Sequence, residues 1–217
     1  MKYLLVLCFA AGAFLAAFAD APDAWRFRWP ALVPDVAEHS CEPTRRVVLD
    51  ENVTVEIVCG RVEERPAQMW VADKMEAWFC RRPKMRGPTA VSAKAGAPDS
   101  DGHAGRVTLP GDEAYELSAK DGVVRISANT MQGVRWAMMT LRQIAQPVRG
   151  TFKTTAYEVP EFTVRDRPET SFRAMHLCAF PEVSPARIER GIRMAAYYKF
   201  NYVILESWGT FRSETHP

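Results

Sequence analysis

Short apolar runs and two segments of helical periodicity follow one another between residues 45 and 147. The expected strands are 46–49, 53–59, 106–109, 114–119 and 123–128. Asp50-Glu51-Asn52 separates the first two runs and predicts a hairpin between them. Lys120-Asp121-Gly122 predicts a second hairpin, because its glycine can take the positive φ that a tight turn needs.

Two amphipathic helices accompany these strands. The first begins near Pro66 and ends before Pro83, since proline suits the first turn of a helix and blocks its continuation. The second spans about residues 131–145 and stops before Pro147. The expected buried residues are Met69, Ala72, Met75 and Phe79 in the first helix, and Val134, Met138, Leu141 and Ala145 in the second. This order predicts an α+β domain, with an antiparallel sheet and two helices on one face.

The pattern from residue 166 to 217 is strand, helix, strand, with the elements expected at 172–178, 185–199 and 202–207. Ser184 and Pro185 have the residue types favoured at a helix start. A single βαβ unit cannot bury both faces of its strands. We therefore expect these residues to begin a (β/α)8 barrel, truncated here, whose other strands follow Pro217 in a longer protein.

The first 19 residues have the features of a secretory signal peptide. Lys2 gives a positive start, residues 3–18 are apolar, and Ala17-Phe18-Ala19 fits a cleavage site. We expect a secreted or periplasmic protein with no stable membrane span after cleavage; an uncleaved anchor is the alternative. Residues 20–44 are expected to be an irregular lead-in, and residues 148–165 a connector.

Charge and cysteine content narrow the function classes. The chain has 28 Lys and Arg residues against 26 Asp and Glu residues, and this balance is unlike that of a nucleic-acid-binding protein. Four cysteines lie beyond the signal peptide, at positions 41, 59, 80 and 178, without the spacing of a metal site or a disulfide framework. The sequence predicts neither a metal ligand nor a cofactor.

Two groups of motifs have the residue spacing of a known enzyme family. The helix 133–143, ending in Thr-Leu-Arg-Gln, follows the strand Tyr115-Glu116-Leu117. Further on stand Asp166-Arg167-Pro168, Phe172-Arg173 and Lys199-Phe200-Asn201. Over roughly residues 45–206 the chain resembles the family 20 glycoside hydrolases, the β-N-acetylhexosaminidases, in their small α+β domain and the start of their barrel.

This resemblance implies an exported glycoside hydrolase that removes terminal N-acetylhexosamine residues from glycans. It implies a retaining mechanism in which the substrate's own N-acetyl oxygen attacks the anomeric carbon, helped by an Asp-Glu pair after the fourth barrel strand. Asp50-Glu51 and Asp112-Glu113 lie elsewhere and are interpreted as solvated turn residues. No catalytic residue is therefore assigned within residues 1–217, and this piece alone is expected to be inactive.

Three residues are candidates for binding the sugar. The resemblance places Arg173 on sugar hydroxyls, which a guanidinium fork can grip; the alternative is a structural arginine paired with Asp166 or with a barrel carboxylate. Glu206 ends the second barrel strand, where such barrels carry their active sites, and Trp208 can stack on a sugar ring. A loop glutamate and a packed tryptophan are the alternatives. His176 lies on the opposite strand face from Arg173 and is interpreted as a hydrogen-bonded interior or interface histidine rather than a general base.

The sequence departs from the family at three places. Ala174 replaces the usual glycine, Cys178 an aspartate, and residues 204–208 a His-x-His segment. Two other functions therefore stay open: another barrel glycosidase that shares the small domain, such as an α-glucuronidase-like enzyme, or a non-catalytic carbohydrate-binding protein. An Asp-Glu pair after a fourth barrel strand would favour hydrolysis.

Overall fold

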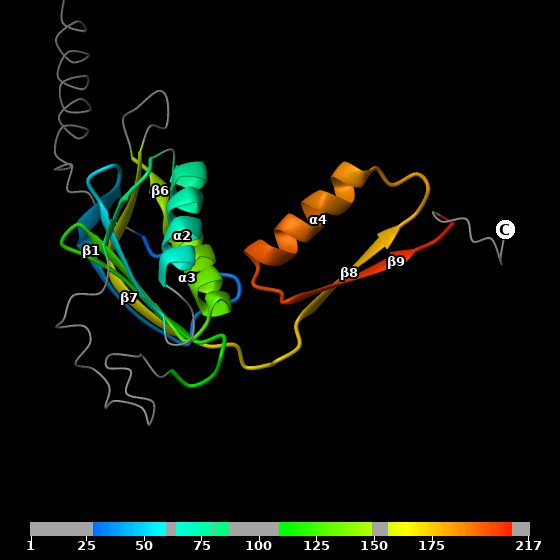
Figure 1. Ribbon diagram of the computed structural model, residues 1–217, viewed down its shortest axis with the longest axis horizontal. Coiled ribbons are helices and arrows are strands. Elements are labelled where there is room, and N and C mark those ends of the chain that lie inside the picture. The colour runs from blue at the N-terminus through cyan, green and yellow to red at the C-terminus, as the bar shows by residue number, and fades with distance from the viewer. Residues whose placement is uncertain (1–27, 60–63, 80, 87–108, 149–155, 210–217) are drawn as a thin grey trace, which may run out of the picture.

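The computed structural model describes residues 28–59, 64–79, 81–86, 109–148 and 156–209. These residues form a seven-stranded sheet with two helices on one face, followed by a separate β-α-β unit (Figure 1). The expected signal peptide and most of the strand expected at 106–109 lie outside this range.

The elements follow one another in a simple order along the chain. The large sheet contains β1 (Glu38–Leu49), β2 (Thr54–Cys59), β3 (Lys84–Arg86), β4 (Tyr115–Lys120), β5 (Val123–Ala128), β6 (Gln146–Pro147) and β7 (Tyr157–Asp166). Its helices are α2 (Glu64–Phe79) and α3 (Met131–Ile144). The second unit contains β8 (Ala174–Ala179), α4 (Pro185–Tyr197) and β9 (Tyr202–Ser207).

The large sheet is mixed, so the expected purely antiparallel sheet is wrong. Its order is β1-β7-β4-β5-β2-β3, with β6 on β7, and β2 runs parallel to both β3 and β5. The chain passes from β2 to β3 through α2, and a helical crossover of this kind brings the next strand back in the same direction. The hairpin expected at Asp50-Glu51-Asn52 is also wrong, because β1 pairs with β7 while β2 pairs with β5 and β3.

The hairpin between β4 and β5 is confirmed. The two strands pair antiparallel in register around Asp121 and Gly122. Both turn residues have positive φ, 49° and 76°, as the tight turn that matches strand twist requires.

The expected connector contains a strand of the sheet, β7, which lies between β1 and β4. Pro160 interrupts this strand, because proline cannot donate to a strand ladder. In the structure, Pro160 lies at the point where the β1–β7 register shifts between Glu42 and Arg46, and the ladder to β4 starts only at Phe162. A proline is tolerated beside such a bulge, so the sheet reaches Asp166.

Helix α3 packs closely on the sheet. Its expected residues Val134, Met138 and Leu141 are fully buried. Gly133 permits this packing, since a Cβ at that position would lie 2.6 Å from the Ala114 carbonyl oxygen. In α2 the expected residue Met69 is 58% exposed. The residues of α2 that are buried are Ala67, Val71, Ala72, Met75 and Phe79.

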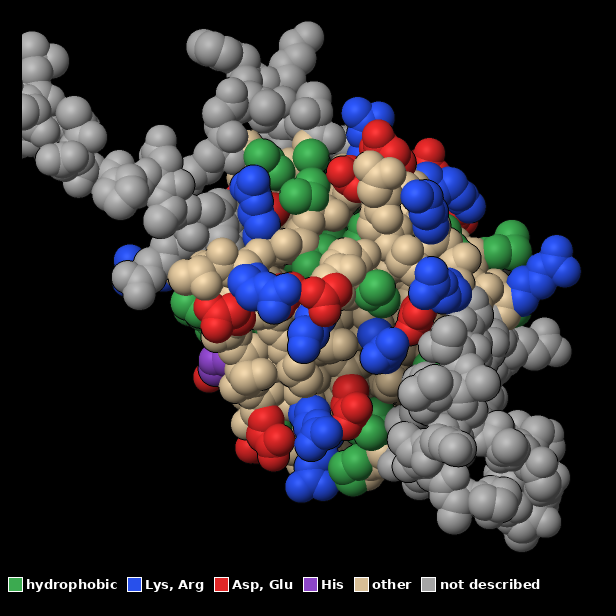
Figure 2. All heavy atoms as spheres, turned by 90° about the vertical axis from the view of Figure 1, so that its left-hand side faces the viewer, with side chains coloured by type: hydrophobic (Ala, Val, Ile, Leu, Met, Phe, Trp, Pro, Cys, Tyr) green, Lys and Arg blue, Asp and Glu red, His purple; other side chains and the backbone are tan. Residues whose placement is uncertain are grey.

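The face of the sheet that is turned away from α2 and α3 carries charged side chains of both signs (Figure 2). Arg125 and Arg86 both pair with Glu56, at 2.7 and 3.5 Å. Arg165 pairs with Glu116 at 2.9 Å. The intermixed charges leave no broad patch of one sign on this face, in agreement with the composition.

The β8-α4-β9 unit is open on one side. Its two strands pair in parallel, and α4 packs on the face that carries Leu177, where a Cβ on Gly191 would lie 2.9 Å from the leucine side chain. Ala195 of α4 is buried, whereas Ile192 is 46% exposed. Much of β9 is exposed as well. Among the described residues, no helix is long and apolar enough to cross a membrane.

Candidate functional site

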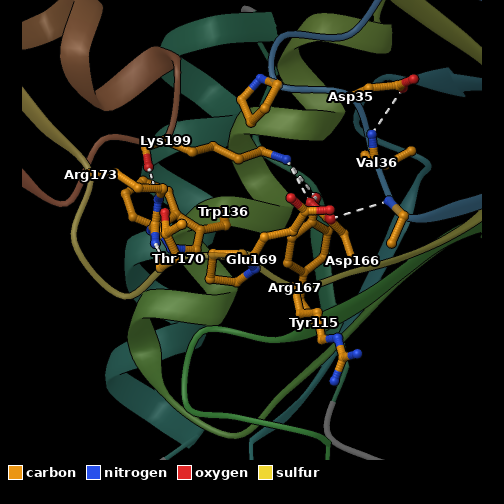
Figure 3. A pocket seen from close by; sticks show the side chains of 13 residues that line it. Asp35, Val36, Tyr115, Trp136, Asp166, Arg167, Glu169, Thr170, Arg173 and Lys199 are labelled. Carbon is orange, nitrogen blue, oxygen red and sulfur yellow. Dashed lines mark hydrogen bonds and ion pairs between the residues drawn. The ribbon is translucent and has the colours of Figure 1, made fainter.

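A buried polar network joins the large sheet to the β8-α4-β9 unit (Figure 3). The Lys199 Nζ atom lies 2.9 Å from Asp166 Oδ2 and donates to the Tyr115 hydroxyl at 2.8 Å. Tyr115 donates its only hydroxyl proton to Asp166, so the Thr140 hydroxyl, 2.6 Å away, donates to Tyr115. Each group therefore has a partner, as buried polar groups require.

Burial sets the proton affinities in this network. Burial lowers the pKa of Lys199, and the nearby Asp166 carboxylate opposes that effect only in part. Burial raises the pKa of Tyr115 well above its ordinary value, and the charge of Asp166 raises it further. The tyrosine is therefore a neutral donor, and Lys199 with Asp166 forms the charged pair.

Arg173 lies in the same junction, one residue before β8, with a side chain only 17% exposed. Its guanidinium donates to the carbonyl oxygens of Lys199 and Thr170 and to the Glu113 carboxylate. It also lies 5.8 Å from the centre of the Trp136 ring. All three nitrogens of the guanidinium contact protein oxygens, an arrangement that supports a structural role, with Glu113 as the partner rather than Asp166.

Glu113 lies in the same junction and is partly buried. Its carboxylate accepts from Arg173, from Trp136 Nε1 at 2.7 Å and from Asn201 Nδ2 at 3.0 Å, and its side chain is 21% exposed. Burial would raise the pKa of Glu113, but these hydrogen bonds outweigh burial and lower it. The interpretation of Glu113 as a solvated turn residue is therefore wrong, because a distant segment supplies its partners.

A cavity of about 550 Å³ opens beside this network, lined by residues of the lead-in, α3 and the segment before β8. Figure 3 shows Asp166 and Lys199 meeting on one side of it and Arg173 with Thr170 on the other. Of the charged groups in the junction, Lys199 is paired with Asp166 and Arg173 with Glu113. These pairs orient the β8-α4-β9 unit on the sheet.

The other candidates lie at the C-terminal ends of β8 and β9. Glu206 pairs with Cys178 across the strands, and its Oε2 atom lies 2.8 Å from His176 Nε2. Trp208 follows directly and is 56% exposed. His176 has the hydrogen bond expected of it, and among the described residues its side chain is half-exposed.

The structure therefore separates the three predicted sugar-binding residues. Glu206 and Trp208 share one end of the strands, whereas Arg173 precedes the other end. Five residues of extended chain separate Arg173 from Cys178, roughly 16 Å along the strand. Binding of sugar by any of the three stays a prediction.

Sequence reasoning missed the junction as a site. Tyr115 and Thr140 stand inside the motifs that carried the family resemblance, so those motifs were the available signal. No motif next to Glu113 or Trp136 in the sequence indicates their role in the junction, because their partner Arg173 lies at least 37 residues away.

The family comparison matches residues 30–167 to "Glycosyl hydrolase family 20, domain 2". No curated protein sequence matches the chain significantly. An exo-β-N-acetylglucosaminidase from Vibrio harveyi has a similar structure, with a TM-score of 0.57 and 20% identity over 86% of this chain and 26% of that one.

Two further solved structures share the fold. The N-acetyl-β-hexosaminidase of Streptomyces plicatus gives a TM-score of 0.58 at 21% identity, over 85% of this chain and 36% of that one. The Flavobacterium johnsoniae chitobiase gives 0.52 at 19% identity, over 80% and 26%. The chain therefore spans about a quarter to a third of the length of these three proteins.

Proposed function

The chain belongs to glycosyl hydrolase family 20, and from this premise we propose that it forms part of an exported β-N-acetylhexosaminidase. The observation that carries the proposal is the match of residues 30–167 to domain 2 of that family. The proposed reaction removes terminal N-acetylhexosamine from glycans with retention, and the substrate's acetamide is the nucleophile. The proposed catalytic Asp-Glu pair belongs to a part of the protein other than residues 1–217.

We propose that β8, α4 and β9 begin the catalytic (β/α)8 barrel. The parallel pairing of the two strands and the packing of α4 on one of their faces support this proposal. Exposed Tyr202, Ile204 and Leu205 on β9 support it too, because further strands would cover such residues. We propose that the barrel begins after Asp166, the last residue of β7, and that residues 1–19 are a signal peptide.

The proposed sugar contacts at the strand ends are Glu206 and Trp208. The carboxylate can accept hydrogen bonds from hydroxyls, and the exposed indole ring offers a face to the C–H groups of a pyranose. Arg173 is kept as a third candidate from the family resemblance. Its engagement by Glu113 favours a structural role instead.

Release of p-nitrophenol from p-nitrophenyl N-acetyl-β-glucosaminide tests the proposal. A protein that includes residues 1–217 and the sequence encoded after them should release it, whereas residues 1–217 alone should not. The p-nitrophenyl glucoside without the acetamide is the matched control, and it should react far more slowly because the nucleophile is missing. Equal rates on the two substrates would contradict the acetamide mechanism.

Two other functions predict different outcomes. Hydrolysis of a glucuronide substrate in place of the hexosaminide would favour an α-glucuronidase-like barrel enzyme. Binding of N-acetylglucosamine with no hydrolysis of any substrate would favour a carbohydrate-binding protein.

A further inference from the structure

Three different metal-binding side chains meet at the C-terminal ends of β8 and β9. Cys178 and Glu206 are partners in the parallel register, and His176 precedes Cys178 by two residues, on the same face of its strand. This face is opposite the one covered by α4, because Leu177 between them contacts Gly191 of that helix. Figure 1 shows these strand ends pointing away from the large sheet, so the group is remote from the Lys199 junction.

The distances are those of a compact ligand set. The His176 Nε2 atom lies 2.8 Å from Glu206 Oε2, and Cys178 Sγ lies 3.8 Å from the same oxygen. All the ligand atoms lie within 4.8 Å of one another. Zinc bonds of about 2.0–2.3 Å in a tetrahedron place two ligands roughly 3.3–3.8 Å apart, so small side-chain rotations would suffice.

The spatial arrangement of the three side chains argues against a role for Cys178 as a catalytic nucleophile. A reactive cysteine needs its sulfur beside the imidazole that takes its proton. Here the Glu206 carboxylate contacts both His176 and Cys178 and lies between them. A cation that displaced the imidazole and thiol protons of these hydrogen bonds would meet an imidazole nitrogen, a thiolate and a carboxylate oxygen at one point.

We infer that His176, Cys178 and Glu206 form a binding site for a divalent zinc-type cation. A thiolate with an imidazole favours zinc over magnesium or calcium, which prefer oxygen ligands. Three protein ligands leave a fourth position for water or for an oxygen of a bound small molecule. His176 and Glu206 are 51% and 38% exposed, so an ion can reach them from solution. The inference goes beyond the proposed sugar hydrolysis, which needs no metal, and it gives Glu206 a role other than the sugar contact proposed for it above.

Zinc binding to the purified full chain, freed of metal with a chelator, provides the first test. Isothermal titration with Zn²⁺ should give one ion per chain. Losing an outer-shell partner of a metal ligand costs about 10–100-fold in affinity. His176→Asn and Glu206→Gln remove direct ligands, so each should weaken binding by at least that much.

Cobalt gives the second test, because a thiolate ligand produces a sulfur-to-metal charge-transfer band. Co²⁺ should give this band with the wild-type chain and none with Cys178→Ser. Cys41→Ser is the matched control, since Cys41 lies on β1 of the other sheet, and it should leave both readouts unchanged. Circular dichroism should show equal folding in all variants, because the three side chains have no buried partners to lose.

Three results would overturn the inference. They are the absence of stoichiometric Zn²⁺ binding by the wild-type chain, a charge-transfer band that survives in Cys178→Ser, and a loss of binding in Cys41→Ser. None of them bears on hexosaminidase activity, which is measured separately with the p-nitrophenyl substrates.

Discussion

Lys199 is the residue on which the junction between the two parts of the molecule depends. Its side chain is 6% exposed and ion-paired with Asp166, while its backbone has a φ of 60°, unusual for a residue with a side chain. Helix α4 ends at Tyr197, two residues before Lys199, and the chain then turns toward β9. The ammonium group thus holds the end of this helix to the large sheet.

Lys199→Met should lower the free energy of unfolding by about 3–5 kcal/mol, because removal of one partner leaves Asp166 buried without its counter-charge. Urea denaturation of the full chain measures this. Arg193→Met is the matched control, since Arg193 pairs with Glu189 on the exposed face of α4 and should change stability by less than about 1 kcal/mol. Equal losses in the two variants would mean that burial of the Lys199 pair is unimportant.

Glu113 should make stability sensitive to acid. Its folded pKa lies below the ordinary value of 4.5, so its contribution is present above about pH 4.5 and is lost as the pH falls through the folded pKa. Glu113→Gln should therefore be less stable than wild type at pH 7 and should lose less stability between pH 5 and pH 3.

Urea midpoints measured across that pH range provide the check on Glu113. Glu189→Gln on exposed α4 serves as the control and should follow the wild-type curve. A Glu113→Gln curve parallel to wild type would show that this carboxylate does not carry the acid sensitivity.

The role of Arg173, structural or sugar-binding, can be determined by comparing the stability and the turnover of a variant. Because its guanidinium contacts Glu113 and two backbone carbonyls, Arg173→Ala should lower the melting temperature and leave turnover per folded molecule nearly unchanged in the active longer protein. Loss of a hydrogen bond to a charged group costs about 1.5–3 kcal/mol. An unchanged melting temperature with severely reduced turnover would return Arg173 to the sugar site.

At the scale of elements, two glycines show how closely each helix approaches its strands. Gly133 of α3 faces backbone, since a Cβ there would lie 2.6 Å from the Ala114 carbonyl oxygen. Gly191 of α4 faces the end of the Leu177 side chain, which can rotate away. The same substitution should therefore have different effects in the two helices.

Gly133→Ala should destabilise the chain by about 1–3 kcal/mol, because overpacking against backbone exceeds the gain of about 1 kcal/mol in helix propensity. Gly191→Ala should be near neutral or slightly stabilising. The melting temperatures of both variants, compared with wild type, test this prediction. A Gly133→Ala variant as stable as wild type would mean that α3 can shift on its sheet at little cost.

At the scale of the whole molecule, the sheet extends past both expected boundaries. It begins at Glu38 and ends at Asp166, and β7 separates β1 from β4. A piece limited to residues 45–147 would lack the strand that joins β1 to the rest of the sheet. The cooperative unit therefore has to include both ends.

A protein of residues 28–167 should unfold in one cooperative transition, whereas residues 45–147 should not. Denaturation followed by circular dichroism tests both pieces. The shorter piece also loses Trp29, which stacks on His39 and packs edge-on against Phe162. A cooperative transition for residues 45–147 would show that β7 adds little to the core.

Elements with local signals could be predicted from the amino-acid sequence alone. The positive-φ turn at Asp121 and Gly122, the amphipathic stripe of α3 and the start of α4 at Pro185 all follow from a few adjacent residues. The family resemblance could also be detected from the sequence, because its motifs are short. They include residues such as Gly133, which close packing of α3 requires.

Strand pairing and the partners of the buried charges became known only from the three-dimensional arrangement. The placement of β7 in the sheet, the parallel direction of β2 and the pairing of Glu113 with Arg173 each depend on residues far apart in the chain. The same holds for His176, Cys178 and Glu206, which a parallel register brings together across a helical crossover. Burial of apolar faces selects such partners over the whole molecule, and no local pattern of residues encodes that choice.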